Sequence, residues 1–293
     1  MPDPQLVELR LDAVLPPEMA EKAEAAGVKK AGLSAAATFI LAILAGAFIA
    51  LGAVFATTVT AGAAGHLSFG VTRLLGGLVF CLGLVLVVVA GAELFTGNNL
   101  IVMAWASRRI STASLLRNWA IVYAGNFVGA FATAALVVAS GQYTFGAGSI
   151  GLNALATANA KCSLGFVQAF ALGILCNALV CLAVWLCFSA RSTTDKILSI
   201  IFPITAFVAA GFEHSVANMY FIPVGLLIAE FAPPEFWQGV GQLVGDYPDL
   251  GWSQFAIGNL LPVTLGNIIG GSLLVGAVYW VVYRRGASGR SGP

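Results

Sequence analysis

Residues 211–219, GFEHSVANM, place a carboxylate and an imidazole side by side between two apolar segments, IFPITAFVAA and YFIPVGLLIAE. An imidazole can give or take a proton near neutral pH, and a carboxylate can accept hydrogen bonds or pair with a cation. An ionisable group that faces a helix-bundle interior within a bilayer usually belongs to a substrate or proton path, because it is costly there. His214 is therefore the first candidate functional residue, and a satisfied structural histidine is the alternative.

A second segment, GAELFTGN at 91–98, resembles GFEHSVAN at 211–218. Farther along, GNFVGA at 125–130 matches GNIIGG at 266–271. Two matches in the same order indicate a duplication of a three-span unit, and the odd number turns the second copy upside down in the membrane. Paired interruptions at matching positions predict a pathway near the bilayer midplane, since irregular backbone at that depth must be buried in protein or line a cavity.

Glu93 and Glu213 occupy matching positions in the two interruptions. Adjacent residues of a helix face different directions, so Glu213 need not share a pore with His214. We expect each carboxylate to accept backbone N–H groups freed at its break, with a proton-carrying role for Glu213 as the alternative. Gly129 and Gly270, in the GNxxG pairs, are expected to serve close helix packing.

A membrane fold must position these residues. Of the 293 residues, 59% are hydrophobic and 9% are charged, against about 25% charged in an ordinary soluble domain. About 20 apolar residues cross a bilayer. Six segments qualify: 34–58, 72–93, 115–139, 165–189, 197–229 and 255–283. The sequence thus predicts an all-α integral membrane protein with six transmembrane helices, inverted three-helix repeats and broken second and fifth helices.

The Lys and Arg residues lie mainly on one side of these spans. Twelve of the 14 fall there, and Arg73 and Lys161 fall on the other side. The positive-inside rule therefore predicts cytoplasmic termini, with loop 231–253, which has no Lys or Arg, on the outside. The expected organisation is a cytoplasmic amphipathic segment at 1–30, a six-span domain at 31–285 with repeats at about 31–139 and 163–285, and a cytoplasmic tail at 286–293.

Several other functions lack their motifs. The interruptions contain no NPA motif of a water channel, and the chain has no CxxCH haem motif, no second intramembrane histidine and no Gly-rich nucleotide loop. The five cysteines are expected to be small apolar residues rather than disulfides or metal ligands, and no nucleic-acid partner is expected. PPEMAEKAEAAGVKK, starting at Pro16, is typical of an amphipathic helix that anchors at the membrane interface.

The motifs GAELFTG, GFEHSVANM and PVTLGNIIGG resemble those of the formate/nitrite transporter family. The similarity continues through NWAIVYAGNFVGA, RSTTDK and PPEFW and covers about residues 12–285, and RSTTDK with the long outer loop is similar to the formate channel branch. The resemblance implies an aquaporin-like protomer with its own pore, assembled as a homopentamer in a bacterial inner membrane, with no cofactor and no enzymatic activity. It implies formate as substrate, as the anion or its acid, with nitrite or another small anion as the alternative. It also implies that the N-terminal helix gates the inner mouth or contacts a cytoplasmic partner.

The same resemblance implies site residues. The central histidine corresponds to His214, its threonine partner to Thr96 and the pore lysine to Lys161. The other polar positions are Glu213, Asn177, Asn218 and Asn267, and the apolar constrictions are Phe80 and Phe207 toward the outside and Leu84, Leu94 and Phe95 toward the inside. One departure is KCSLGF after Lys161, where formate channels carry further histidines; an outer histidine relay is therefore not expected.

Proton transfer to a small carboxylate is chemically feasible at such a site. In water, a proton moves from imidazolium to formate at a cost of about 4 kcal/mol, from pKa values of about 6.5 and roughly 3.5–4. A dry site disfavours both charged partners and so offsets this cost. The apolar constrictions would keep the site dry. Lys161 would draw the anion to the outer mouth, and a positioning charge at a span end is the alternative for this lysine.

Overall fold

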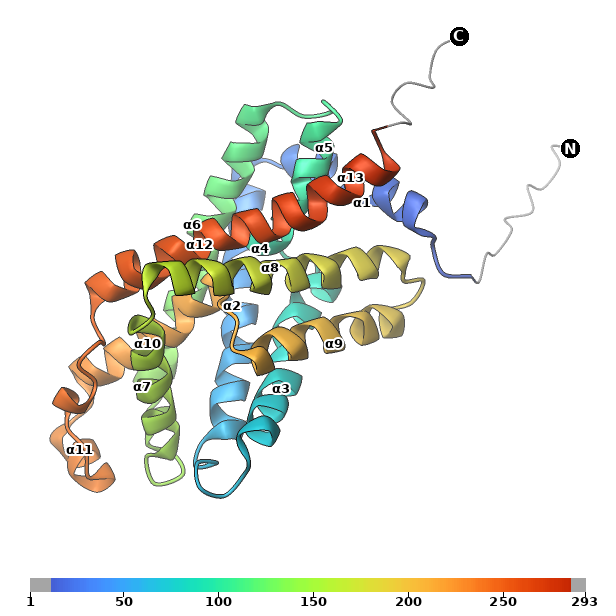
Figure 1. The fold of residues 1–293 in the computed structure, drawn as a ribbon. Helices are drawn as coiled ribbons and strands as arrows, with labels where there is room; N and C mark the ends of the chain where they lie inside the picture. Colours follow the sequence, from blue (N-terminus) through green and yellow to red (C-terminus); the bar gives the residue numbers. More distant parts are fainter. Residues whose placement is uncertain (1–11, 286–293) are drawn as a thin grey trace, which may run out of the picture.

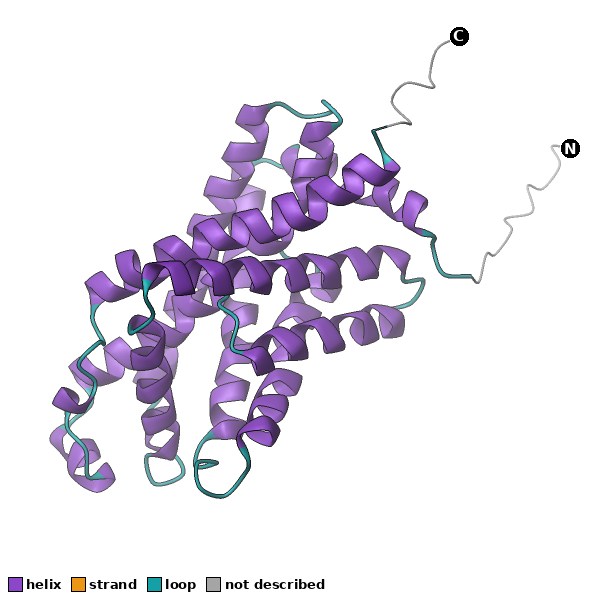
Figure 2. Ribbon diagram, viewed as in Figure 1, coloured by secondary structure: helices purple, strands orange, loops and turns teal. Residues whose placement is uncertain are grey.

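The computed structural model describes residues 12–285, so Arg10, Arg290 and the expected tail at 286–293 lie outside the described residues. Within that range every regular element is helical, as Figure 2 shows. Six of the described helices are long and apolar enough to cross a membrane: Ala35–Thr60, Phe69–Ala90, Thr112–Ala139, Phe166–Ser189, Thr193–Ala210 and Gln254–Tyr283. The predicted all-α membrane fold is confirmed.

The first half of the chain begins with a surface helix and continues with the first three spans. Its elements are α1 (Pro16–Ala31), α2 (Ala35–Thr60), α3 (Phe69–Ala90), α4 (Phe95–Asn98), η1 (Asn99–Ile101), α5 (Val102–Ala106) and α6 (Thr112–Ala139). Serine side chains start two of these spans, because Ser34 accepts the Ala37 N–H and Ser111 accepts the Ser114 N–H. Such caps satisfy backbone donors that have no partner within the helix.

The second half repeats this order and adds short elements between its last two spans. It comprises η2 (Gln142–Thr144), α7 (Ser149–Cys162), α8 (Phe166–Ser189), α9 (Thr193–Ala210), α10 (Ser215–Phe231), α11 (Pro234–Val240), η3 (Val244–Asp246), η4 (Gln254–Leu260), α12 (Leu261–Ile268), η5 (Ile269–Ala277) and α13 (Val278–Tyr283). The last four elements form one continuous span that includes two π-helical stretches.

The packing of the two halves is equivalent. Helix α2 packs against α3 and α6, as α8 packs against α9 and α12, and α3 meets α9 where the halves join. Figure 1 shows α1 and α13 near each other at one end of the molecule, with the loop before α3 and the helix α11 at the opposite end. The arrangement fits the predicted inverted repeat.

Both predicted interruptions are present. Helix α3 ends at Gly91 with φ 83° and α9 ends at Gly211 with φ 77°, a left-handed conformation that glycine adopts without strain. The predicted segment 197–229 is therefore two helices, α9 and α10, whereas the first break is followed by the short, irregular run from α4 to α5.

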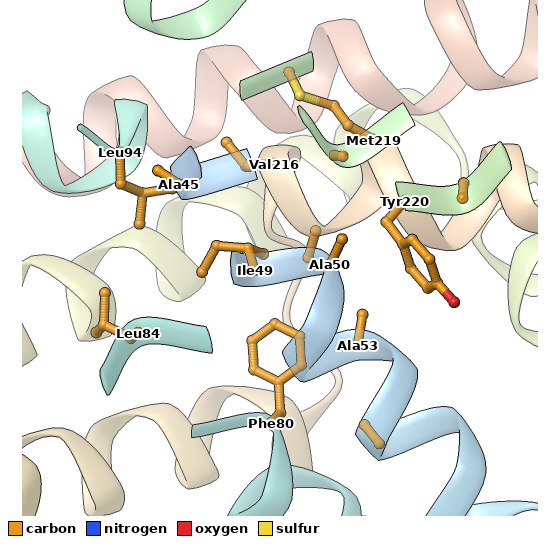
Figure 3. Close-up of a cluster of buried hydrophobic side chains, with 14 of the residues drawn as sticks. Ala45, Ile49, Ala50, Ala53, Phe80, Leu84, Leu94, Val216, Met219 and Tyr220 are labelled. Atoms are coloured by element: carbon orange, nitrogen blue, oxygen red, sulfur yellow. The ribbon is translucent and has the colours of Figure 1, made fainter. Parts of the chain in front are cut away.

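Small residues allow the helices of each half to touch. A Cβ atom at Gly129 would lie 1.9 Å from the Ile43 carbonyl oxygen, and one at Gly270 would lie 2.1 Å from that of Ile174. These contacts fit the expected packing role of the GNxxG glycines. The main apolar cluster joins both halves, and Figure 3 shows Phe80, Leu84, Leu94 and Val216 among its members.

Candidate functional site

His214 lies at the start of α10, where the second break ends, and it is buried. The Ala217 N–H donates to Nδ1 of His214 at 3.0 Å, so the imidazole is also the N-terminal cap of α10. Its Nε2 atom lies 3.0 Å from Oγ1 of Thr96. A ring nitrogen that accepts a hydrogen bond bears no proton, so the neutral ring carries its proton on Nε2 and donates it to the threonine. The structure thus brings the expected histidine and threonine together across the two breaks.

A cavity of about 700 Å³ reaches His214 from the loop side that contains Leu67 and Phe69. Phe80 and Phe207 line it near the imidazole, with ring centroids 5.8 Å apart in an edge-to-face arrangement. Phe207 also stacks on His214 with centroids 5.8 Å apart and an interplanar angle of 18°. Phe207 therefore lies between Phe80 and the imidazole, and both phenylalanine rings line the cavity.

The three apolar residues expected toward the inside are all buried. Leu84 and Leu94 lie in the apolar cluster that Figure 3 shows, together with Phe80. Phe95 packs edge-to-face against Tyr123, with ring centroids 4.9 Å apart. None of Leu84, Leu94 and Phe95 lines the outer cavity.

Asparagine side chains close the backbone at both breaks. Asn267 accepts the Ser215 N–H at 2.9 Å and donates to the carbonyls of Gly173 and Glu213. In the other half Asn126 accepts the Phe95 N–H at 2.9 Å and donates to the carbonyls of Ala42 and Glu93.

These contacts satisfy backbone groups of each break from the third span of the same half, as buried backbone requires.

The expected role of the glutamates is wrong in one respect. We expected Glu213 to accept freed backbone N–H groups, but these go to the asparagine oxygens just described. The Glu213 carboxylate instead accepts from Lys161 at 2.7 Å, from Asn218 at 2.6 Å and from Asn259 at 3.2 Å. Asparagine suits the backbone of the break better because its amide offers both a donor and an acceptor, whereas a carboxylate only accepts.

The first half contains the same network around Glu93. That carboxylate accepts from Lys30 at 2.7 Å and from Asn98 at 2.7 Å, and Asn98 also donates to Asn118 at 3.0 Å. Lys30 lies on α1 and Lys161 on α7, so the correspondence extends to the helix that precedes each three-span unit.

Two of the matching positions that differ between the halves contribute the side chains that meet at the centre. In the aligned interruptions, His214 corresponds to Leu94 and Thr96 corresponds to Val216. Symmetric contacts therefore support an asymmetric centre: one polar pair, His214 and Thr96, beside one apolar pair, Leu94 and Val216. Figure 3 shows Leu94 and Val216 with their side chains in the same buried cluster.

The remaining predicted asparagines differ in their exposure to the cavity. Asn218 lines it, whereas Asn177 and Asn267 do not. Asn177 is fully buried and its Nδ2 lies 3.3 Å from the Thr96 carbonyl, 2.7 Å from Asn99 Oδ1 and 2.6 Å from the Asn267 carbonyl. Its contacts connect the threonine segment of one half to the last span of the other, so the geometry gives it a supporting position behind the centre.

Helix α1 is fastened to the membrane domain by a buried carboxylate, Glu24. Glu24 accepts from Ser107 at 2.7 Å, from Arg284 at 2.9 Å and from Arg109 at 3.0 Å. Burial alone would raise the pKa of Glu24, but these hydrogen bonds and the charge of Arg284 outweigh burial and lower the pKa below its ordinary value. The carboxylate therefore stays ionised at neutral pH and holds α1 against α5 and α13.

Comparisons with known proteins agree with this architecture. A family described as formate/nitrite transporter matches residues 17–281. Formate channel FocA of Escherichia coli strain K12 is 50% identical over 274 residues, which cover 94% of this chain and 96% of FocA. Formate channel FocA of Haemophilus influenzae is 47% identical over 264 residues, covering 90% of this chain and 93% of that protein.

A solved structure described as a pentameric formate channel with formate bound is similar with a TM-score of 0.81 and 49% identity, covering 85% of this chain and 97% of that one. The fold, the paired breaks and the matching sequences thus give one answer. The chain is a multi-pass membrane protein that belongs to the formate/nitrite transporter family, a family of transporters rather than enzymes.

Proposed function

We propose that this protein is a formate channel with a pore in each protomer, and that His214 is its central proton-handling residue. The observation that carries the proposal is the hydrogen bond between His214 Nε2 and Thr96 Oγ1, made between two helix breaks at the end of a cavity. The similarity to proteins named formate channels supports formate as the substrate. Nitrite is the second candidate, because a small planar anion with two oxygens meets the same groups.

Formate would enter the outer cavity, pass Phe80 and Phe207 and meet the Nε2–H of His214. The phenylalanine rings cannot solvate an anion, so they favour passage of the neutral acid. Leu94 and Phe95 impose the same condition beyond the centre. A proton must therefore be available at the place where the anion loses its water, and His214 is the residue there that can exchange one.

The hydrogen bonds of His214 define what proton donation requires. Nδ1 accepts from the Ala217 N–H, so the ring shown by the structure is the neutral Nε2–H form. An imidazolium must carry a second proton on Nδ1, which replaces the contact with Ala217. When Nε2 then donates its proton to formate, the neutral ring keeps its other proton on Nδ1. Tautomer exchange returns that proton to Nε2. The cycle thus couples proton transfer to release and recovery of the α10 cap.

The test is His214→Asn, measured in proteoliposomes that contain a pH-sensitive dye. Asparagine caps helices well and preserves the fold, but it cannot protonate formate. We expect this variant to lose formate-linked proton movement per folded oligomer, with any residual current carried by the anion. His66→Asn, in the exposed outer loop, is the matched control and should keep the coupling. Wild-type coupling in His214→Asn would refute the proton-handling role, and competition between formate and nitrite would rank the two substrates.

We further propose a homopentamer in a bacterial inner membrane with both termini in the cytoplasm. The similar solved structure is described as pentameric, which supports the assembly. The orientation is supported by the Lys and Arg distribution and by the absence of both residues from loop 231–253. In this orientation α1 lies at the inner mouth. Its exposed side, which carries Glu18, Lys22 and Lys29, would bind a cytoplasmic partner. The gate we propose is the docking of α1 itself against the membrane domain.

A further inference from the structure

The outer cavity contains a second cation, Arg73, which the expected site did not include. Arg73 lies near the start of α3 and lines the cavity together with Lys161, Glu213 and His214. Its Nε donates to the Ala209 carbonyl at 3.2 Å and its Nη2 donates to the Val208 carbonyl. The guanidinium therefore rests on the last carbonyls of α9, beside the break at Gly211.

The other cation of the cavity is already compensated. Lys161 Nζ lies 2.7 Å from Glu213 Oε1, and 16% of the Lys161 side chain and 5% of the Glu213 side chain are exposed. A pair this close acts on a distant anion as a dipole rather than as a full charge. Among the described residues that line the cavity, Arg73, Lys161 and Glu213 are the charged ones, so Arg73 supplies the excess positive charge.

A neighbouring outer segment carries negative charge, so the positive charge of Arg73 matters for the entry of an anion. Residues 230–253 contain Glu230, Glu235, Asp246 and Asp249 and no Lys or Arg. None of these residues lines the cavity, and their net negative charge does not attract an anion. Arg73 hydrogen-bonds to backbone carbonyls rather than to a carboxylate, so it keeps a positive charge toward the cavity, which the nearby Glu213 carboxylate and the partial charge at the end of α9 reduce.

We propose that Arg73, rather than Lys161, is the residue that attracts the substrate anion into the outer cavity. The inference rests on the proposed anion-transport function and identifies which charge draws the anion in. Lys161 then has a different task, which is to neutralise Glu213 beside the break. The position that matches Arg73 in the second half is Thr193, so this charge is a feature of the outer cavity and not of the repeat.

The test uses formate uptake at low concentration into right-side-out membrane vesicles, with ionic strength varied and osmolarity held constant. The screening length is about 30 Å at 0.01 M salt and about 3 Å at 1 M. We expect Arg73→Gln to lower uptake per folded oligomer about three- to tenfold at low salt and to approach wild type at high salt. Arg73→Lys keeps the charge and should retain the wild-type salt dependence.

Two further variants make the result specific. Arg117→Gln is the matched control, because Arg117 also donates to a backbone carbonyl, that of Leu33 in the turn between α1 and α2, but lies on α6 at the opposite side. It should leave the salt dependence unchanged. Thr157→Lys adds a cation to the lining of the same cavity and should raise the ratio of low-salt to high-salt uptake, both alone and combined with Arg73→Gln.

Three outcomes would overturn the proposal. A loss in Arg73→Gln that is equal at all salt concentrations would make Arg73 a structural cap of α9 only. An unchanged salt dependence in Arg73→Gln would transfer the role to another charge. If Arg73→Gln does not assemble, an unchanged uptake ratio in Thr157→Lys would count against the idea. Absence of formate uptake in the wild type would instead refute the proposed substrate, and the same salt series with nitrite would still test Arg73.

Discussion

Removal of Lys161 should expose how strongly the buried Glu213 carboxylate depends on its cation. In Lys161→Met, the contact of 2.7 Å between Nζ and Oε1 is lost, and the Glu213 carboxylate keeps only 5% of its side chain exposed. Loss of one partner of a buried ion pair typically costs about 3–5 kcal/mol, because the remaining charge is uncompensated. Asn218 and Asn259 still donate to the carboxylate, so we expect about 3 kcal/mol.

The assay is unfolding in mixed micelles with increasing SDS, where a loss of about 3 kcal/mol changes the unfolding equilibrium constant about 100-fold, at 1.36 kcal/mol per decade. The added change Glu213→Gln removes the stranded charge and should restore most of the stability. Lys30→Met is the control in the first half. There 33% of the Lys30 side chain and 7% of the Glu93 side chain are exposed, so the pair as a whole is more accessible to water and we expect a smaller loss, about 1–2 kcal/mol.

The explanation fails if Lys161→Met loses less than about 1 kcal/mol, or if Glu213→Gln does not rescue it. Either result would mean that Glu213 is already neutral, or that water reaches it despite its burial.

Three other predictions follow from the same contacts. Phe207→Ala removes the ring between Phe80 and His214 and should lower the preference for formate over lactate about tenfold, measured by competitive uptake; unchanged discrimination would remove Phe207 from the constriction. Gln242→Cys should react with an impermeant thiol reagent on intact cells, and reaction only after permeabilisation would reverse the proposed orientation. Because the pKa of Glu24 is lowered in the folded protein, its contribution to docking of α1 is present above the unfolded pKa of about 4.3 and is lost as pH falls through the lower folded pKa. Spin labels on α1 and α13 should therefore separate only in acid, and Glu24→Gln should abolish that pH dependence; a separation that persists in the Gln variant would assign the change to another group.

The spans and both breaks could be predicted because their signals are local and strong. Long apolar segments require a membrane, and Gly91 and Gly211 interrupt them where a left-handed turn was needed. His214 was predicted because it is an ionisable residue beside its break, whereas Thr96 was implied by the resemblance to the formate/nitrite transporter family. The short irregular run after the first break was not predicted, because its residues are as apolar as those of α10.

The partners of the two glutamates could not be predicted from local sequence. Lys161 and Lys30 lie on helices separate from those of the glutamates. From sequence, a positive charge at the end of a span is normally interpreted as a sign of membrane orientation and not as one half of a buried ion pair. The repeat did contain a usable signal for Asn126, because GNFVGA matches the GNIIGG that includes Asn267. Arg73 had no such mate. Its position against the end of α9 depends on how α3 and α9 pack, which one sequence does not specify.

Each break is closed by side chains of its own half, and this has a consequence for synthesis. Lys30, Asn118 and Asn126 reach the first break, and all of them are translated before α7 begins. The amino-terminal half can therefore satisfy its buried polar groups while the rest of the chain is still on the ribosome, as the general order of domain folding favours. Only contacts such as that of Thr96 with His214 must wait for the second half. The half-built chain would then sit in the bilayer as a stable insertion intermediate, with completion of the pore as the last step of biogenesis.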